Sequence, residues 1–361
     1  MKDKVKIFWA SMGTGSGNLF GYSTHNTNMV EYVRKTGRAE ISSDPKSDIA
    51  VYITSPGNFH ERPPIPPVLF TMWEGTDLPG TYHDELKQAD YLFTPSTYVQ
   101  DLFSKYFDPT KIYTIQEGVK FDFKYKERKS HPKHFRYLWV GAPNPRKGFE
   151  ELTAIWEKLG LAKYPNIELY LKTSGLKKPR IEKNQNIIID SRSIPVWELV
   201  QLYHSAHCFV WPTRGEGFGL CLAEAMATGL PCVCTYATGV TDFFDDEVGY
   251  PVMKTYKKTM DFFAFPGGPK IAETTLILPD ATEVAQKMIE VYENYPKALI
   301  KGKKASIRIK SKFTWERSAE IFMNAIDDIL RREREQRQCN NREFIHIQPN
   351  VRIDVDQHPE L

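Results

Sequence analysis

The sequence predicts an α/β protein built from two doubly wound domains, and three observations carry that prediction. A strand–loop–helix–strand pattern is clear at residues 207–235, and this unit is typical of a doubly wound sheet. The length of 361 residues suits about two domains, each with room for a core. A hydrophobic fraction of 41% and a charged fraction of 26% are those of a globular protein in water.

Each element of this strand–loop–helix–strand unit can be assigned in order along residues 207–235. The continuous apolar run at 207–211 fits a parallel strand that is buried on both faces. A Gly-rich turn follows, and then the helix formers LCLAEAMA. Gly229 ends this helix, Pro231 blocks its continuation, and residues 232–235 are predicted to form the next strand.

Two carboxylates stand out in this unit. Glu216 lies in the loop, and Glu224 lies in a helix whose neighbouring residues are apolar, so that its charge needs a partner. The loop glycines let backbone N–H groups at the helix start approach an anion, at the edge of the sheet where ligands bind. A phosphate beside two carboxylates that accept hydrogen bonds from hydroxyls indicates a sugar nucleotide. The alternative is that Glu216 caps the helix and Glu224 forms a salt bridge.

The segment EGFGLCLAEAMATGLPCV, residues 216–233, resembles the signature of retaining glycosyltransferases of family four. The resemblance implies the GT-B fold, in which two Rossmann-like doubly wound domains face a cleft. It also implies that Glu216 contacts hydroxyls of the transferred sugar and that Glu224 binds the ribose of the nucleotide. The loop residues that would hold the donor beside them are Gly217, Phe218, Gly219 and Leu220.

The first domain is predicted at residues 1–125, with a charged linker at 126–134. Its predicted elements are a strand at 5–10, a Gly-rich loop, a helix at 27–35, strands at 48–54 and 68–74, a strand followed by a helix capped by Ser96 or Thr97 within 89–107, and a closing segment at 111–123. That closing segment resembles one in which the family has an asparagine, and Glu117 occupies its place.

Three residues of the first domain are candidates for the site. The resemblance implies that the Gly-rich loop reaches the donor phosphates or the acceptor through Gly21, and a plain flexible loop is the alternative. Glu74 ends the predicted strand at 68–74, near a place where relatives often have a histidine. It is a candidate for catalysis and for binding acceptor hydroxyls together with Asp77. Helix capping by Asp77 is the alternative.

The second domain is predicted at residues 135–312. Its first loop carries Arg146 and Lys147 at the end of a strand, and two cations there suit a diphosphate. Lys147 matches the lysine that holds the donor diphosphate in the resembled family. The family's arginine position is Ala142 here, and Arg146 is a candidate for the missing charge. Ordinary solvated surface charges are the alternative.

The remaining segments complete this domain and close the chain. The resemblance implies nucleotide contacts at the ends of strands 167–175 and 187–190, with Thr173 and Arg192 as candidates. Residues 262–280 are predicted to be an irregular insert, and residues 282–296 a helix. The resemblance implies that a closing helix at 313–335 packs back on the first domain. The tail at 336–361 alternates near its end, as an edge strand or a partner contact would.

Charge and cysteine content bear on partners and compartment. The net charge of +3 argues against a dominant nucleic-acid footprint. The basic stretch Lys297–Lys312 is a candidate for a peripheral membrane or DNA contact, and a solvated helix face is the alternative. Five cysteines, mostly in apolar strands, suit core positions in a reducing compartment. With no apolar run of transmembrane length and no signal peptide, a cytoplasmic location is expected.

The resemblance therefore implies transfer of a hexose or pentose from a UDP- or GDP-sugar to a hydroxyl, with retention and without a cofactor or a metal. The acceptor is open between a glycan, a lipid, a protein and a hydroxylated nucleic-acid base. Three alternatives remain: a nucleotide-sugar-binding protein without turnover, an epimerase of the same fold, and a metal-dependent transferase using Asp354 and Asp356.

Overall fold

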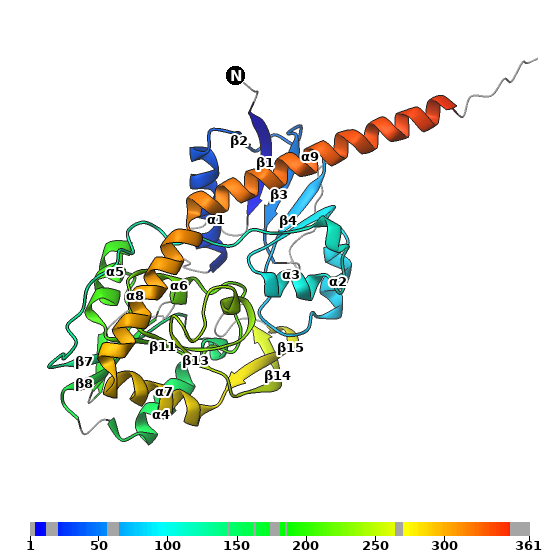
Figure 1. Cartoon of the computed structure of the whole chain (residues 1–361). Coiled ribbons are helices and arrows are strands. Elements are labelled where there is room, and N and C mark those ends of the chain that lie inside the picture. The colour runs from blue at the N-terminus through cyan, green and yellow to red at the C-terminus, as the bar shows by residue number, and fades with distance from the viewer. Residues whose placement is uncertain are drawn as a thin grey trace, which may run out of the picture.

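The computed structural model describes residues 4–11, 21–55, 65–142, 144–161, 164–173, 181–184, 186–263 and 270–346. These residues form two sheets, each flanked by helices, and a two-stranded hairpin that extends from the second domain (Figure 1). The predicted α/β architecture with two doubly wound domains is confirmed.

The first sheet is entirely parallel, with strand order β2-β1-β3-β4-β5-β6. The strands are β1 (Val5–Ser11), β2 (Ala39–Ser42), β3 (Ile49–Ile53), β4 (Pro67–Phe70), β5 (Tyr91–Thr94) and β6 (Ile112–Thr114). The helices are α1 (Gly21–Lys35), α2 (Gly80–Leu86) and α3 (Thr97–Phe103), with a 3₁₀ turn, η2, at Pro109–Lys111. Ser96 caps α3, as predicted, by accepting the Val99 N–H at 3.3 Å.

Two predicted elements of this domain need correction, and one strand was missed. The strand expected at 68–74 ends at Phe70, so Glu74 lies in the loop after the strand. The helix expected from residue 27 begins at Gly21, and the short strand β2 was not predicted. The loop at 12–20, which contains most of the Gly-rich stretch, lies outside the described residues.

The second sheet has the order β13-β12-β11-β7-β8-β10-β9, and all neighbours are parallel except β9 and β10. Its strands are β7 (Phe135–Val140), β8 (Ile167–Lys172), β9 (Ile181–Asn184), β10 (Ile187–Asp190), β11 (Cys208–Trp211), β12 (Cys232–Thr235) and β13 (Tyr250–Val252). The helices are α4 (Phe149–Lys158), α5 (Val196–Ser205), α6 (Leu220–Ala227), α7 (Ala281–Glu293) and α8 (Tyr295–Lys312), with 3₁₀ turns η3 (Pro145–Lys147) and η5 (Thr238–Asp242).

The unit β11–α6–β12 is built as the sequence predicts. Every residue of both strands is buried, since helices cover the two faces of the sheet. Gly229 adopts a φ of +75° just after α6, a conformation that ends a helix and suits glycine. Cys208, Cys232 and Cys234 are buried in these strands as free thiols, which confirms them as core residues.

The predicted irregular insert is instead an antiparallel hairpin of β14 (Thr255–Phe263) and β15 (Lys270–Pro279). Its Thr274 and Leu276 are buried, since β15 contacts both domains. The Ile277 N–H donates to the Arg214 carbonyl at 2.9 Å, and the Thr76 N–H donates to the Thr275 carbonyl at 2.8 Å. The hairpin thus spans from the second domain to the loop that follows β4 in the first.

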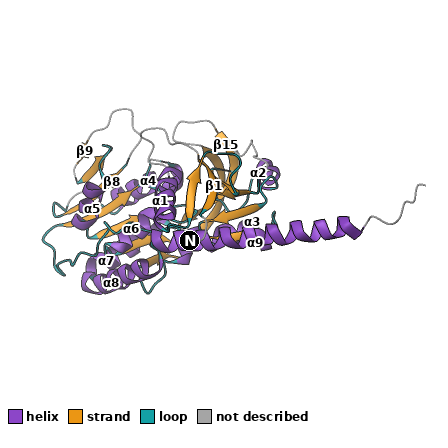
Figure 2. Ribbon diagram, turned by 90° about the horizontal axis from the view of Figure 1, so that it is seen from above, coloured by secondary structure: helices purple, strands orange, loops and turns teal. Residues whose placement is uncertain are grey.

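Helix α9 (Trp315–His346) returns the chain to the first domain, as the resemblance implies. Trp315, Phe322, Ile326 and Ile329 are buried in a core cluster with residues of α1, β1 and β4. The predicted tail at 336–361 begins as part of this helix, which runs past the body of the molecule in Figure 2. The alternating stretch lies mostly beyond residue 346 and, with Asp354 and Asp356, outside the described residues. Throughout the described ranges, every helix is too short or too polar to cross a bilayer.

Candidate active site

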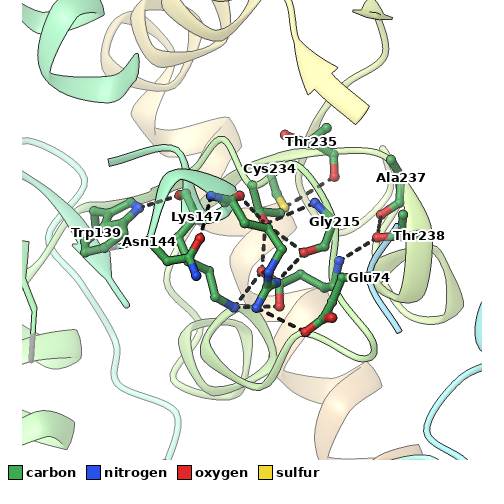
Figure 3. Close-up of polar contacts among 12 residues, drawn as sticks. Glu74, Trp139, Asn144, Lys147, Gly215, Cys234, Thr235, Ala237 and Thr238 are labelled. Atoms are coloured by element: carbon green, nitrogen blue, oxygen red, sulfur yellow. Dashed lines mark hydrogen bonds and ion pairs between the residues drawn. The ribbon is translucent and has the colours of Figure 1, made fainter. Parts of the chain in front are cut away.

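Polar side chains from both domains meet where the carboxyl ends of β4, β7 and β11 face one another. Glu74 comes from the loop after β4, Arg146 and Lys147 from the turn after β7, and Glu216 from the loop after β11. Figure 3 shows Glu74, Lys147 and Gly215 drawn together by dashed contacts. The structure thus brings all four predicted catalytic residues into one cluster.

Lys147 and Glu216 form the centre of this cluster. The ammonium of Lys147 lies 2.7 Å from each carboxylate oxygen of Glu216, whose side chain is only 6% exposed. The Thr213 hydroxyl donates to the same carboxylate at 2.6 Å. Burial alone would raise the pKa of Glu216, but the charges of Lys147 and Arg146 outweigh it and hold that pKa below its usual value. Glu216 is therefore an ionised, well-ordered acceptor.

Arg146 joins the two domains. One guanidinium nitrogen, Nη1, lies 3.2 Å from Glu216 Oε1 and donates to the Gly215 carbonyl at 2.5 Å. The other, Nη2, lies 3.1 Å from Glu74 Oε1 in the first domain. Burial disfavours the charge of Arg146, yet the carboxylates of Glu74 and Glu216 raise its pKa. Its buried Nε–H has no acceptor among the residues described, so the guanidinium keeps an unused donor.

The turn that carries the two cations is fixed by local sequence. The Asn144 side chain accepts the Arg146 N–H at 2.9 Å and so caps η3. Gly148 then adopts a φ of +70°, and a Cβ there would collide with the Pro212 carbonyl, so glycine is required for the close approach of β11. Trp139 donates to the Lys147 carbonyl at 3.0 Å, as Figure 3 shows.

The loop between Glu216 and α6 presents backbone donors. The Glu216 N–H donates to the Thr238 hydroxyl at 2.8 Å, and Gly219 reaches a φ of +114° just before the helix. Across the described ranges, the buried N–H groups of Gly217, Phe218 and Gly219 donate to no acceptor. Unsatisfied N–H groups at a helix start, with the helix dipole behind them, are suited to bind an anion.

Glu224 is a half-buried residue on α6. It accepts a hydrogen bond from the Tyr203 hydroxyl at 3.1 Å, and within the described part of the chain it forms no ion pair. Burial raises its pKa to about 7, with the neighbouring carboxylate of Glu117 adding to this and Lys120 opposing it. The alternative of a salt-bridged Glu224 is therefore not observed.

The other predicted site residues have hydrogen bonds or positions of their own. The Asp77 carboxylate accepts from the Thr275 N–H at 2.7 Å and from the Thr274 hydroxyl at 3.0 Å, so it anchors the hairpin. At the end of β10, Arg192 pairs with Asp190 at 2.8 Å and Glu198 at 3.0 Å. The two remaining residues are Thr173, whose N–H donates to the Asp190 carbonyl at 2.9 Å, and Gly21, the first residue of α1.

Several residues that structure this site were not predicted. Thr213 and Thr238 hold Glu216, and Tyr203 holds Glu224. The Ser96 hydroxyl, predicted only as a helix cap, also donates across the domains to the Gly217 carbonyl at 2.6 Å. Thr213 precedes Glu216 by three residues, a spacing that sequence reasoning could have used. The others come from distant segments and leave no local signal.

A second buried pair of titratable groups lies in the first domain. His25 Nδ1 and Glu117 Oε1 are 2.7 Å apart, and both side chains are almost fully buried. His25 Nε2 has no hydrogen-bond partner in the described ranges. Glu117, which occupies the family's asparagine position, thus has a structural partner that the sequence did not reveal. No group of three or more potential metal ligands occurs among the residues that the structure describes.

The fold is shared with solved GT-B glycosyltransferases. Anabaena HepE, solved in complex with UDP and glucose, is similar with a TM-score of 0.62 at 12% identity, over 90% of this chain and 100% of that one. Residues 134–294 match the family described as glycosyl transferases group 1. Residues 134–294 therefore resemble the group 1 glycosyltransferases, and the chain has the GT-B fold of these solved structures.

Curated relatives align with parts of the chain. The O-antigen chain mannosyltransferase B of Escherichia coli is 42% identical over 53 residues, which are 15% of this chain and 14% of that protein. The probable sucrose-phosphate synthase of Thermosipho melanesiensis is 23% identical over 232 residues, which are 60% of this chain and 47% of that protein. The chain thus spans less than half the length of either relative.

Proposed function

We propose that this chain transfers a sugar from a UDP- or GDP-sugar to an acceptor hydroxyl with retention of anomeric configuration. The observation that carries the proposal is the convergence of Lys147, Arg146 and Glu216 beside buried N–H groups at the start of α6. Cations and N–H groups suit a diphosphate, and an ionised carboxylate suits sugar hydroxyls. HepE, with the same fold, was solved with UDP and glucose.

Donor binding redistributes the contacts of Lys147. In this structure its ammonium donates to Glu216 at 2.7 Å. When a diphosphate arrives, Lys147 and Arg146 turn toward its oxygens, and Glu216 is released to accept hydrogen bonds from the sugar. Glu224, whose pKa is about 7, accepts from the ribose hydroxyls in its ionised form.

The reaction breaks the bond between the anomeric carbon and the diphosphate oxygen. Negative charge then grows on the diphosphate, where Lys147, Arg146 and the loop N–H groups stabilise it, and the removal of one such donor typically costs about 10²–10³-fold in rate. The acceptor oxygen bonds to the anomeric carbon on the same face, and its proton passes to a departing phosphate oxygen. This route needs no protein nucleophile, no cofactor and no metal. Glu74, which faces Arg146 from the first domain, orients the acceptor hydroxyl.

The test compares Lys147→Ala and Glu216→Gln with Lys158→Ala, which removes an exposed lysine at the end of α4. Both site variants are expected to lose turnover about 10²-fold or more with UDP- or GDP-sugars, because charge on the leaving group is no longer stabilised or the sugar is no longer oriented. The Lys158 variant keeps its activity. Unchanged rates in both site variants would refute the proposal.

The stereochemistry and the alternatives are tested on the same material. Nuclear magnetic resonance of the product is expected to show the anomeric configuration of the donor, and an inverted product would contradict retention. Tight nucleotide binding without product from any donor would favour the binding protein without turnover. Conversion of the nucleotide sugar into its epimer would favour the epimerase. The cytoplasmic location stays a prediction.

A further inference from the structure

Helix α8 carries an unusual charge distribution. Its 18 residues, YPKALIKGKKASIRIKSK, include seven lysines and arginines and no acidic residue. One side packs on the domain through Ala298, Gly302 and Ile309, which are fully or almost fully buried. Two of the cations are used by the protein itself, since Lys301 donates to the Gly249 carbonyl at 3.0 Å and Arg308 pairs with neighbouring carboxylates. The remaining five cations face solvent.

The opposite side of α8 combines these cations with apolar side chains. Ile300 and Ile307 are two turns apart on the solvent side, and each is 62% exposed. Exposed lysines flank this ridge on both sides, and none of them forms an ion pair within the described ranges: Lys297, Lys303, Lys304 and Lys310. We call these two isoleucines and four lysines the outer face of α8. The helix lies at the periphery of the second domain in Figures 1 and 2.

Residues just before the linker lie beside one end of this face. Burial and the nearby charge of Lys124 lower the pKa of Lys310, so the two ammonium groups are neighbours. Phe121, at 78% exposure, lies under the ammonium of Lys124 at 4.5 Å from the ring centroid. This segment therefore places a further lysine and an exposed aromatic ring beside the basic helix.

We propose that the outer face of α8 docks the protein on an anionic lipid surface. A basic helix with an apolar ridge between its lysines lies in the interface plane of a bilayer, with the apolar side chains inserted and the ammonium groups near lipid phosphates. Duplex DNA would satisfy the lysines but would leave Ile300 and Ile307 opposite charged phosphates. The exposed isoleucines therefore favour a lipid surface over nucleic acid. The positive charge of the outer face requires that this lipid surface be anionic.

The first test measures co-sedimentation with phosphatidylcholine vesicles that contain or lack phosphatidylglycerol. The protein is expected to bind only the anionic vesicles. The variant with glutamine at positions 297, 303, 304 and 310 is expected to lose affinity, by about fivefold for each lysine removed. A matched control changes Lys46, Lys87, Lys105 and Lys258 to glutamine, which alters the net charge equally on other surfaces. An equal loss in the control would overturn the proposal.

The second test separates the lipid from nucleic acid. The double variant Ile300→Gln and Ile307→Gln keeps every charge, and its circular dichroism and melting curve report whether it is folded. Its affinity for anionic vesicles is expected to fall about tenfold, because the apolar contact is lost. Vesicle binding equal to that of the parent protein, or tighter binding to duplex DNA than to vesicles, would overturn the proposal. Neither readout depends on glycosyl transfer.

Discussion

The two domains have the same architecture but contribute unequally to the site. Both are parallel sheets, apart from the antiparallel strand β9 of the second, with helices on each face, and in both the central strands are buried. The second domain supplies Lys147, Arg146, Glu216 and the start of α6, whereas the first supplies Glu74 and the Ser96 hydroxyl. The family match at residues 134–294 falls on the same half.

This difference has a chemical origin. Binding a diphosphate needs glycines, backbone donors and cations at fixed positions near one strand end. These groups therefore occur within a few contiguous residues of the sequence. Among the described residues, the first domain contributes no such contiguous set to the site. Its side chains reach the site through contacts with distant residues, such as Glu74 with Arg146. If the two domains contribute differently to the site, substitutions in each should have different effects.

The largest effect is expected from Glu74→Gln, which removes the first domain's charge from the site. Arg146 loses its cross-domain partner and is free to shift, and a displacement of about 1 Å can cost roughly 10²-fold in turnover. Nucleotide affinity should change little if, as proposed, the second domain holds the donor. Steady-state kinetics and nucleotide titration measure the two effects, with Glu127→Gln as an exposed control. If nucleotide affinity falls as much as turnover, the first domain also takes part in binding the donor.

Within the second domain, Glu224 contrasts with Glu216. Its folded-state pKa of about 7 lies above the ordinary value of 4.5, so between these values the folded protein binds the proton more tightly than the unfolded chain. Stability should therefore fall as pH rises from about 4.5 to 7 and stay lower above that.

Glu224→Gln removes this pH dependence. Relative to the variant, the parent protein is expected to lose at most about 3 kcal/mol between pH 4.5 and 8. Urea unfolding at several pH values measures the difference, and stability curves that run parallel for the two proteins would show that burial does not raise this pKa.

The sequence predicts those parts of the site whose structure is determined by neighbouring residues in the chain. The bounds of α6 and β12 follow from the order of apolar and glycine residues within a short segment. The family resemblance of two separate segments placed Lys147 and Glu216 in one site, and the structure brings them into contact. The hairpin β14–β15 was not predicted, because its register depends on contacts with the loop around Thr76 in the other domain. The pairing of His25 with Glu117 depends likewise on folding, since neither residue has a local pattern around it.

A smaller effect is expected at Asp77, where the first domain holds the hairpin of the second. Asp77→Asn keeps the shape but weakens the charged hydrogen bonds to Thr274 and Thr275, which should cost about 1–3 kcal/mol. Hydrogen exchange is expected to accelerate at the Thr275 amide. If Asp77 instead binds the acceptor, as the sequence predicts, Asp77→Asn should raise the KM for the acceptor. The hairpin amides would then stay protected from hydrogen exchange.

The smallest effect is expected at Arg38, where α9 is tied to the first domain by exposed charges. The guanidinium contacts Glu320 at 2.8 Å and Asp327 at 2.9 Å, but both carboxylates are about half exposed. Arg38→Ala should therefore destabilise the protein by less than about 1 kcal/mol, since water and salt screen such pairs. Phe322, fully buried under the same helix, provides the contrast, because Phe322→Ala typically costs about 3–5 kcal/mol. If urea unfolding gave similar losses for both variants, α9 would be held to the first domain by its charges as much as by its apolar face.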